Sequence, residues 1–391
     1  MPAARKFDIV LFGATGFTGA LTAEYLARNA PASLRWAIAG RNLDKLARVR
    51  DQLAAINPAC AKLELLQADV GAPDSIREVA ESTRVVITTV GPYIFYGEPL
   101  VAACAAAGTD YVDLTGEPEF VDLMWLRYHE QARSTGARIV HCCGFDSIPH
   151  DLGALFTVQQ LPSDAPIKVE GFVRAGGTFS GGTFHSAVNA FGRVRQYAQV
   201  RKERIRREGP GPRKVKGGKQ TIHFERALKT WVVPMPTIDP QVVKRSAREL
   251  DVYGPEFSYA HYVQVKKLAG VVGLVGGVSA MFTLAQLKLT RDWLLSKKNP
   301  GEGPDEEQRK KSWFRVRFTG EGGGKRVVTE VTGGDPGYGE TSKMLAESAL
   351  CLALDALPKR SGQLTPAIAM GNALIDRLQR AGIAFRVIEG P

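Results

Sequence analysis

The first 142 residues alternate between short apolar runs typical of strands and longer segments with helical spacing. The connections between them are short, and the last apolar run ends at Cys142. Strict alternation of this kind predicts an α/β fold, in which helices cover both faces of a parallel sheet. Six runs match the count of a complete doubly wound (Rossmann) sheet: FDIVLF, LRWAIAG, KLELLQA, RVVITTV, DYVDLT and RIVHCC.

The turn after the first run contains three glycines, each three residues from the next, in the sequence GATGFTG. Such a turn between a strand and a helix presents backbone amides and the positive helix end to an anion, for which a pyrophosphate is the natural ligand. The spacing is GxxGxxG rather than GxGxxG, but its place in a βαβ pattern favours dinucleotide binding. We expect the whole turn to contact the cofactor: Gly13, Ala14, Thr15, Gly16, Phe17, Thr18 and Gly19.

The end of the second run decides which dinucleotide is expected. NAD sites usually carry an acidic residue there, whereas NADP sites supply a cation. Here Arg41, with Asn42 beside it, can bind the 2′-phosphate through its forked guanidinium. We therefore predict NADP(H). The alternative is that Arg41 is an ordinary surface residue at a helix start.

Other candidates for cofactor contact follow the third and fourth runs. Asp69 can accept a hydrogen bond from the adenine amine, or it can cap the next helix. Thr88, Gly91 and Pro92 lie at the carboxyl edge of the sheet, where ligands bind in open α/β folds. The glycine and proline are expected to shape the loop beside the nicotinamide ribose, with a plain loop as the alternative.

Five side chains from separate motifs are candidates to polarise a substrate carbonyl or supply a proton. Two lie in CGFDSIPHDLG, where helix capping explains the polar residues equally well. Two more belong to DPGYGETSK, for which turn formation is the favoured alternative. The candidate catalytic residues are Tyr93, Asp146, His150, Tyr338 and Lys343.

After Asp146 the regular alternation stops. The runs SWFRVRFTGEG and GKRVVTEVTGG predict a hairpin, so a second, α+β domain with a mixed or antiparallel sheet is expected. Near the end of the chain, GETSKMLAESALCLALDAL and TPAIAMGNALIDRLQRAG predict two helices and IAFRVIE a closing strand. We predict three parts: an NADP-binding Rossmann domain over 1–147, a substrate or partner domain over 148–334, and C-terminal helices and a strand over 335–391 that return to the Rossmann domain.

Composition restricts the class of protein. With 391 residues, 44% of them hydrophobic and 23% charged, the chain can form two domains and is neither disordered nor a polytopic membrane protein. Its five cysteines show no ligand spacing, so we expect reduced, buried thiols and no metal site. The sequence contains neither a GxSxG nor an HExxH motif, so a hydrolase is not expected. The beginning of the chain has no signal-peptide pattern, and we expect a cytosolic protein, with contact to a membrane surface as a further possibility.

The formal net charge of +11 is concentrated between Arg193 and Lys229, where thirteen Lys or Arg accompany three acids. We expect this stretch to be exposed, either simply solvated or facing an anionic membrane or an acidic partner. It has few aromatic residues for base stacking and no nucleic-acid reader motif, so nucleic-acid binding is not expected.

Residues 269–287, AGVVGLVGGVSAMFTLAQL, carry no charge and are flanked by lysines and an arginine. Their length can just span a bilayer, but several glycines and polar residues argue against a span. A buried or substrate-lining helix is favoured. Peripheral contact with a membrane surface and a true span are the alternatives.

Taken together, these motifs resemble the saccharopine dehydrogenase-like oxidoreductase family, in particular its trans-acting enoyl reductase branch. The resemblance covers nearly the whole chain and rests on GATGFTG, AGRN, TTVGPY, YVDLTGE, CGFDSIPHDLG, GGDPGYGETSKM and TPAIAMGNALIDRL. It implies an NADP-dependent Rossmann domain, an inserted second domain with a mixed sheet, and a C-terminal segment packed against the first domain. It also implies reduction of a carbon-carbon double bond on a lipid or polyketide acyl chain held on a synthase or carrier.

We therefore expect an NADP-dependent oxidoreductase acting on the enoyl group of a lipid or acyl-thioester substrate, with an acidic carrier protein able to dock on the basic stretch. Saccharopine dehydrogenase-type oxidoreduction at a carbon-nitrogen bond is one alternative, although no paired arginines for a dicarboxylate are evident. A non-enzymatic dinucleotide-binding protein associated with membranes or lipid droplets is the other. The oligomeric state is not predicted.

Overall fold

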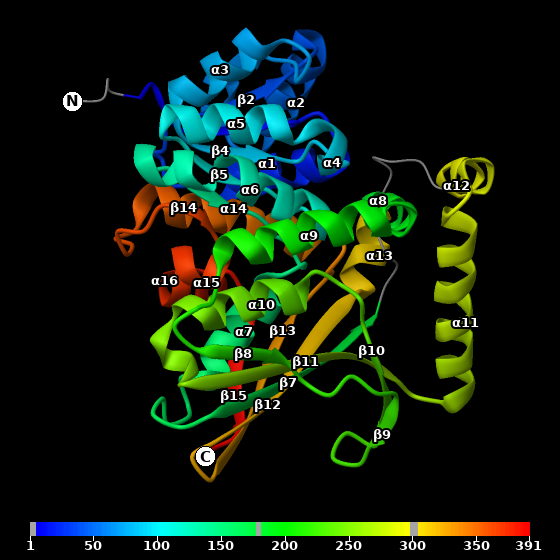
Figure 1. Cartoon of the computed structure of the whole chain (residues 1–391). Helices are drawn as coiled ribbons and strands as arrows, with labels where there is room; N and C mark the ends of the chain where they lie inside the picture. The colour runs from blue at the N-terminus through cyan, green and yellow to red at the C-terminus, as the bar shows by residue number, and fades with distance from the viewer. Residues whose placement is uncertain (1–4, 177–180, 298–303) are drawn as a thin grey trace.

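The computed structural model describes residues 5–176, 181–297 and 304–391, which form two sheets (Figure 1). The first sheet has seven strands, all parallel, in the order β14-β6-β5-β4-β1-β2-β3. This confirms the predicted doubly wound α/β fold. The strands are β1 (Phe7–Phe12), β2 (Trp36–Gly40), β3 (Glu64–Gln67), β4 (Thr83–Thr88), β5 (Asp110–Val112), β6 (Arg138–Val140) and β14 (Gly362–Leu364).

Helices cover both faces of this sheet, and each face has its own core. Every residue of β1 is buried, as continuous apolar strands require when both faces are covered. On one face lie α1 (Phe17–Asn29), α2 (Leu43–Ile56) and α14 (Gly339–Leu354). On the other lie α3 (Pro73–Ser82), α5 (Glu98–Ala107) and α6 (Pro118–Thr135). Short helical turns connect these elements at α4 (Tyr93–Tyr96) and η1 (Pro58–Lys62).

The seventh strand differs from the expectation of six. β14 comes from the C-terminal part of the chain and pairs with β6 through only three residues, too short a run to stand out as a strand in the sequence. The helix predicted after it is two helices, α15 (Pro366–Ala369) and α16 (Gly371–Arg380). Gly371 between them has a φ of +49°, a left-handed conformation that ends regular helix.

The second sheet has eight strands among the described residues and is mixed, as predicted. β7 runs parallel to β11 and antiparallel to β12, and the expected hairpin joins β12 to β13. The order is β15-β13-β12-β7-β11-β10-β9, with β8 beside β11. The strands are β7 (Ile167–Gly176), β8 (Lys214–Gly217), β9 (His223–Glu225), β10 (Thr230–Pro234), β11 (Glu256–Val265), β12 (Trp313–Gly322), β13 (Lys325–Gly333) and β15 (Ala384–Glu389).

The closing strand corrects one prediction. β15 does not return to the Rossmann domain; it pairs antiparallel with β13 and forms the edge of the second sheet. Without β15, β13 would present its own unpaired backbone groups at that edge. The C-terminal segment therefore adds one strand to each sheet, while α14 packs back on the first sheet as expected.

Further helices connect the two sheets or lie at their margins. α7 packs on β12 and β13, α10 packs on α7, and α9 packs on α6. The prediction of a buried helix over residues 269–287 is wrong. Only two residues of the apolar helix α11 are buried. The remaining elements are α7 (Ile148–Val158), α8 (Gly181–Gly192), α9 (Val194–Glu208), α10 (Asp239–Glu249), η2 (Asp251–Tyr253), α11 (Leu268–Ala285), α12 (Lys288–Leu295) and α13 (Glu306–Lys311).

Candidate cofactor and active site

The glycine-rich turn has the geometry expected of a diphosphate cradle. Gly13 has a φ of +93°, and a Cβ there would lie 2.8 Å from Thr89 Oγ1. A Cβ on Gly19 would lie 2.1 Å from the Gly13 carbonyl oxygen, so only glycine lets α1 pack this closely on the turn. Thr15 and Gly16 are exposed at the start of α1, where the first helical amides have no partner within the helix. These residues fit a dinucleotide diphosphate.

The rest of the turn is positioned by other parts of the chain. Ala14 is fully buried, and Thr89, which directly follows β4, donates from Oγ1 to the Gly13 carbonyl at 3.1 Å. The Phe17 ring meets the Tyr338 ring edge-on at a centroid distance of 4.8 Å. Ser342 Oγ lies 3.4 Å from the Thr18 carbonyl oxygen. The C-terminal loop therefore lies beside the glycine-rich turn.

At the ends of β2 and β3 the structure brings Arg41 and Asp69 together. The Arg41 side chain is 79% exposed, and its Nε lies 3.9 Å from Asp69 Oδ2. The guanidinium is therefore free to meet a phosphate while the carboxylate holds it near the sheet edge. Asn42 caps α2 by accepting a hydrogen bond from the Lys45 amide at 2.9 Å. Asp69 does not cap α3; it accepts from the Gly71 amide and forms a tight turn.

Tyr93 does not occupy the position predicted for a catalytic residue. Its hydroxyl points into the domain, donates to the Thr88 carbonyl at 3.1 Å and accepts from the Leu114 amide. Burial raises the pKa of Tyr93 well above its ordinary value. This tyrosine braces the loop of Gly91 and Pro92 and cannot contact a substrate.

The two candidates from DPGYGETSK are placed by a tight turn, as the favoured alternative predicts. Asp335 accepts hydrogen bonds from the amides of Tyr338 and Gly339 at 3.1 and 2.9 Å. Lys343 Nζ donates to Glu340 Oε1 at 3.0 Å, and both side chains are less than one-fifth exposed. Lys343 therefore forms an ion pair with Glu340, and the Tyr338 ring packs against Phe17 of the glycine-rich turn.

His150 meets two residues that the sequence analysis did not single out, Asp239 at the start of α10 and His261 on β11. His150 Nδ1 and Asp239 Oδ1 are 3.1 Å apart, close enough for an ion pair but not aligned for a hydrogen bond. Asp239 Oδ2 lies 3.6 Å from His261 Nε2 and accepts a hydrogen bond from Thr237 Oγ1 at 2.6 Å. His150, Asp239 and His261 are all at most 2% exposed.

Electrostatics divide this cluster into charged and neutral members. Burial disfavours the charged forms of His150 and Asp239, but the attraction between the imidazolium and the carboxylate outweighs this effect. The pKa of His150 is therefore raised and that of Asp239 is lowered. Burial, together with the charge on His150, lowers the pKa of His261 to about 3. Burial, assisted by the Asp239 carboxylate, raises the pKa of Asp146 to about 7. Asp146 can therefore carry a proton at neutral pH.

Asp146 is the member of the cluster that reaches the sheet edge. It is partly exposed, and its Oδ2 lies 3.1 Å from the position a Cβ would take on Gly116, in the loop after β5. Ser147 precedes α7 without a side-chain capping bond, so the capping alternative for this motif finds no support. His150, Asp239 and His261 also offer three ligand atoms within 4.8 Å of one another, a grouping capable of holding a metal that sequence spacing did not predict.

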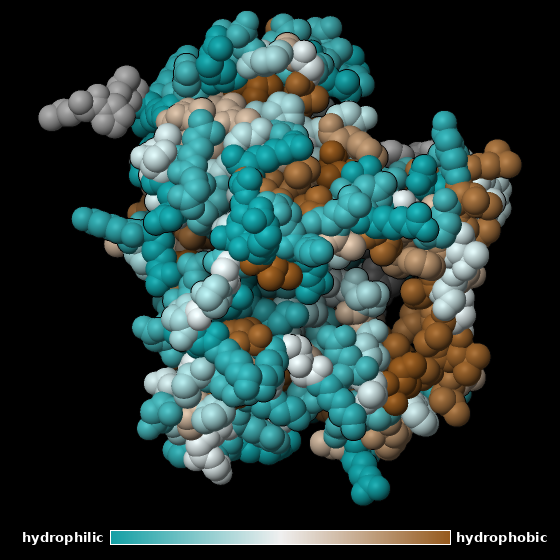
Figure 2. Space-filling model, viewed as in Figure 1, coloured by the Kyte–Doolittle hydropathy of each residue, from teal (hydrophilic) through white to brown (hydrophobic). Residues whose placement is uncertain are grey.

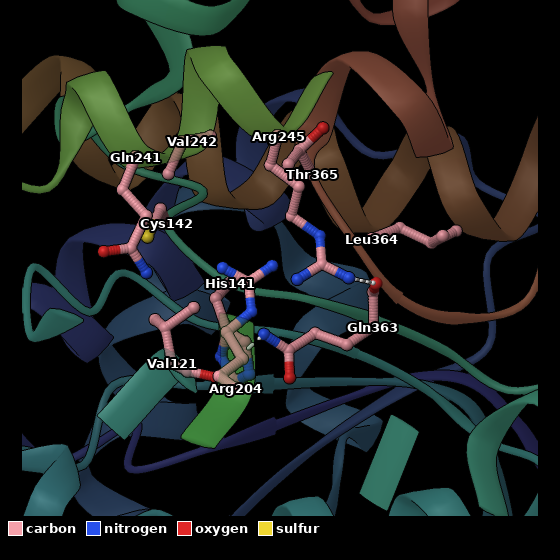
Figure 3. Close-up of a pocket in the computed structure, with 10 residues that line it drawn as sticks. All are labelled: Val121, His141, Cys142, Arg204, Gln241, Val242, Arg245, Gln363, Leu364 and Thr365. Carbon is pink, nitrogen blue, oxygen red and sulfur yellow. Dashed lines mark hydrogen bonds between the residues drawn. The ribbon is translucent and has the colours of Figure 1, made fainter. Parts of the chain in front are cut away.

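A small pocket lies where β6 and β14 end, between α6, α9 and α10 (Figure 3). It contains two buried arginines that the sequence analysis missed, because they lie on separate helices. Arg204 pairs with Asp122 at 3.3 Å, whereas Arg245 has no salt bridge among the described residues and donates to the Gln363 carbonyl. Both guanidinium groups lie over the Trp125 ring. Burial and Arg204 lower the pKa of Arg245 to about 10.

The two-sheet fold and the glycine-rich turn at the carboxyl edge of the first sheet are those of a dinucleotide-binding oxidoreductase. Comparison with known proteins narrows the class, because residues 9–140 match the family model described as saccharopine dehydrogenase NADP binding domain. A Mycobacterium tuberculosis protein provisionally named a trans-acting enoyl reductase is 39% identical over 98% of this chain and 97% of its own length. A Bos taurus protein named saccharopine dehydrogenase-like oxidoreductase is 34% identical over 98% of each chain.

The chain therefore belongs to the saccharopine dehydrogenase-like oxidoreductase family and binds NADP(H). A solved structure, apo saccharopine dehydrogenase (L-Glu forming) from Saccharomyces cerevisiae, shares the fold at a TM-score of 0.57. It is 12% identical and covers 98% of this chain and all of that one. The predicted cofactor is confirmed, whereas the assignment of individual residues to it stays a prediction.

Proposed function

We propose that this protein uses NADPH to reduce the carbon-carbon double bond of an enoyl group on a lipid or polyketide acyl chain. The observation that carries the proposal is the place of Asp146, a partly exposed carboxyl group beside Gly116 at the carboxyl edge of the sheet, with a pKa raised towards neutrality. The name of the Mycobacterium tuberculosis relative supports the enoyl substrate.

Each part of the site has a role in this reaction. The glycine-rich turn and the start of α1 would hold the diphosphate, and Arg41 would hold the 2′-phosphate. NADPH held there would supply the hydride for the electron-poor β-carbon of the enoyl thioester. The electron pair of the double bond moves towards the thioester carbonyl, and Asp146 gives its proton to the α-carbon. Solvent then reprotonates Asp146, while the ion pair of His150 and Asp239 holds α7 in position beside it.

The acyl chain is proposed to arrive as a thioester on an acidic carrier protein. Much of the basic stretch of the sequence is exposed on α9 and on the strands that follow, although Arg193 and Arg204 pair internally with Glu119 and Asp122. The exposed cations of α9 are Arg195, Arg201, Lys202, Arg206 and Arg207. A cationic surface of this kind accelerates encounter with an acidic partner.

The test is NADPH consumption by the purified protein with enoyl thioesters, compared with keto acid and amine pairs. We expect consumption with the enoyl thioesters and formation of the saturated thioester. Consumption only with keto acid and amine pairs would overturn the proposal. Asp146→Asn should abolish most of the activity while NADPH binding persists, which separates failed chemistry from a failed fold.

A second candidate function is oxidoreduction at a carbon-nitrogen bond. It is favoured by Arg245, a buried cation without a salt bridge among the described residues, in a pocket at the edge of the first sheet. Substrates of such reactions carry carboxylates, which bind arginine well. The same assay distinguishes the two: if this second function holds, Arg245→Met should raise the KM for the amino acid.

A further inference from the structure

Helix α11 lies along one edge of the molecule with most of its surface uncovered (Figure 1). Among the described residues it is the one helix long and apolar enough to cross a membrane. Only Val271 and Ala285 are buried. Figure 2 shows the resulting hydrophobic band over α11 and α12 at the right-hand edge, beside a mostly hydrophilic surface.

The exposed apolar side chains are not confined to one stripe. Val272 is 68% exposed, and Leu274 and Val275 are also exposed. Because successive helical residues point about 100° apart, these three side chains point in different directions around the helix axis. A Cβ added to Gly273, Gly276 or Gly277 would meet nothing within 4 Å. A protein groove covers one stripe of a helix, whereas a helix that is apolar on most sides needs surroundings that are apolar on most sides. Lipid provides them.

Two polar side chains in or directly after α11, Thr283 and Gln286, have partners on the chain. Thr283 donates from Oγ1 to the Ser279 carbonyl at 2.9 Å. Gln286 donates to the carbonyls of Phe191 on α8 and Phe282 on α11, at 2.8 and 3.0 Å. Because lipid offers no hydrogen bonds, internal satisfaction of this kind is what an inserted helix requires.

Cations and an aromatic residue flank the apolar surface. Lys266 and Lys267 precede α11, and Lys288 begins α12. On α12 the Trp293 ring is half exposed, and the Lys297 ammonium lies 4.6 Å from its centroid. Tryptophan and lysine are the side chains that anchor proteins at the boundary between headgroups and acyl chains, and lysines favour anionic lipid.

We propose that α11 and α12 insert into the headgroup and acyl boundary of an anionic bilayer and hold the protein at its surface. A span is excluded, because β11 before the helix and β12 after it belong to the same sheet. α11 also contacts β10 and β11 near its start and packs against α8 through Phe282 near its end, so it lies along the body of the protein. The body of the protein therefore covers one side of α11, and the acyl boundary of the bilayer covers the other sides.

The first experiment is flotation of the full-length protein with vesicles of phosphatidylcholine alone and with added phosphatidylglycerol. We expect flotation with the anionic vesicles and weak flotation with the neutral ones. The Trp293 emission should shift to the blue with anionic vesicles, and Trp293→Phe should remove that shift. Failure of the wild-type protein to float with either vesicle would overturn the proposal, whatever reaction the protein catalyses.

Two variants test the two parts of the surface. The first is the double variant Val272→Glu and Leu289→Glu. These residues are 68% and 84% exposed, so the variant should fold normally. Its binding to vesicles should fall at least about tenfold. Lys266→Glu with Lys267→Glu should remove the preference for anionic vesicles. Leu354→Glu, on exposed surface of α14, is the matched control and should float normally. NADPH titration verifies the fold of each variant.

A second copy of the chain is the competing occupant of the apolar surface. In that case the wild-type protein would be a dimer in gel filtration without vesicles, the double glutamate variant would be a monomer, and neither would float. That result would overturn the membrane proposal.

Discussion

Arg41 is the residue on which the choice of phosphorylated cofactor depends. Its guanidinium is mostly exposed and is held near the edge of β2 and β3 by Asp69. We predict that Arg41→Ala weakens NADPH binding by about tenfold to a hundredfold and leaves NADH binding nearly unchanged, because one charge-assisted contact to the 2′-phosphate is lost. Fluorescence titration with both cofactors measures this. Arg48→Ala, an exposed arginine further along α2, is the control. An unchanged preference would refute the role of Arg41.

Asp146 is predicted to act in its protonated form. Because its pKa is raised to about 7, kcat/KM for reduction should be constant at lower pH and should fall as the pH rises through 7. Asp146→Asn should lower kcat by about a hundredfold or more and remove this pH dependence. Asp146→Glu should retain part of the activity and a pH profile. If Asp146→Asn retained the full kcat, another group would be the proton donor.

At the scale of elements, the contact between β1 and α1 depends on glycines with different tasks. A Cβ on Gly19 would clash with the Gly13 carbonyl at 2.1 Å, whereas a Cβ on Gly16 would make an ordinary contact at 3.5 Å. We predict that Gly19→Ala lowers the free energy of unfolding by about 3 kcal/mol or more, because backbone has to move. Urea denaturation measures the loss, and a stable Gly19→Ala protein would contradict the close packing.

Gly16 provides the matched comparison within the same turn. Its φ of −83° suits any residue, and its surroundings are exposed. We therefore expect Gly16→Ala to fold with nearly the stability of the wild type and to bind NADPH more weakly, because the added methyl group lies where the diphosphate approaches. Urea denaturation and cofactor titration together separate stability from binding. Unchanged affinity would place the diphosphate elsewhere.

At the scale of the whole molecule, Asp151 joins three distant segments. Its carboxyl group on α7 accepts from Ser246 Oγ on α10 at 2.6 Å and from the Ala367 amide on α15 at 2.8 Å. Burial raises the pKa of Asp151 from 3.8 to about 7 in the folded protein. Its contribution to stability is therefore complete at low pH and is lost as the pH rises through 7.

We predict that the free energy of unfolding is higher at pH 6 than at pH 8. The raised pKa of Asp146 acts in the same direction. The lowered pKa of His261 acts in the opposite direction, because the unfolded chain binds a proton at pH 6 that the folded His261 does not, but the two carboxyl groups together outweigh it. Asp151→Asn should reduce the difference between the two values, because the amide stays neutral. Asp44→Asn, on an exposed part of α2, should leave the difference unchanged. Urea denaturation at both pH values is the measurement. Equal pH dependence in wild type and Asp151→Asn would show that Asp151 is not responsible.

Sequence reasoning succeeded where the signal is local. The glycine turn and the β12–β13 hairpin are set by residues close together in the chain. It failed where partners are distant. Tyr93 follows a strand at the right edge, yet its ring turns inward. The partners of His150 come from α10 and β11, far along the chain. No periodicity could have indicated that Arg204 and Arg245 flank one tryptophan.

The sequence by itself therefore determined the doubly wound sheet, its nucleotide turn and the family, because strand and helix periods and backbone freedom at glycine are local properties. Only the tertiary structure decided that β14 and β15 join different sheets and that the pKa values of Asp146 and Asp151 are raised towards neutrality. It also decided that α11 faces outward. An apolar helix has the same composition whether protein or lipid covers it, and only the packing of distant segments distinguishes the two.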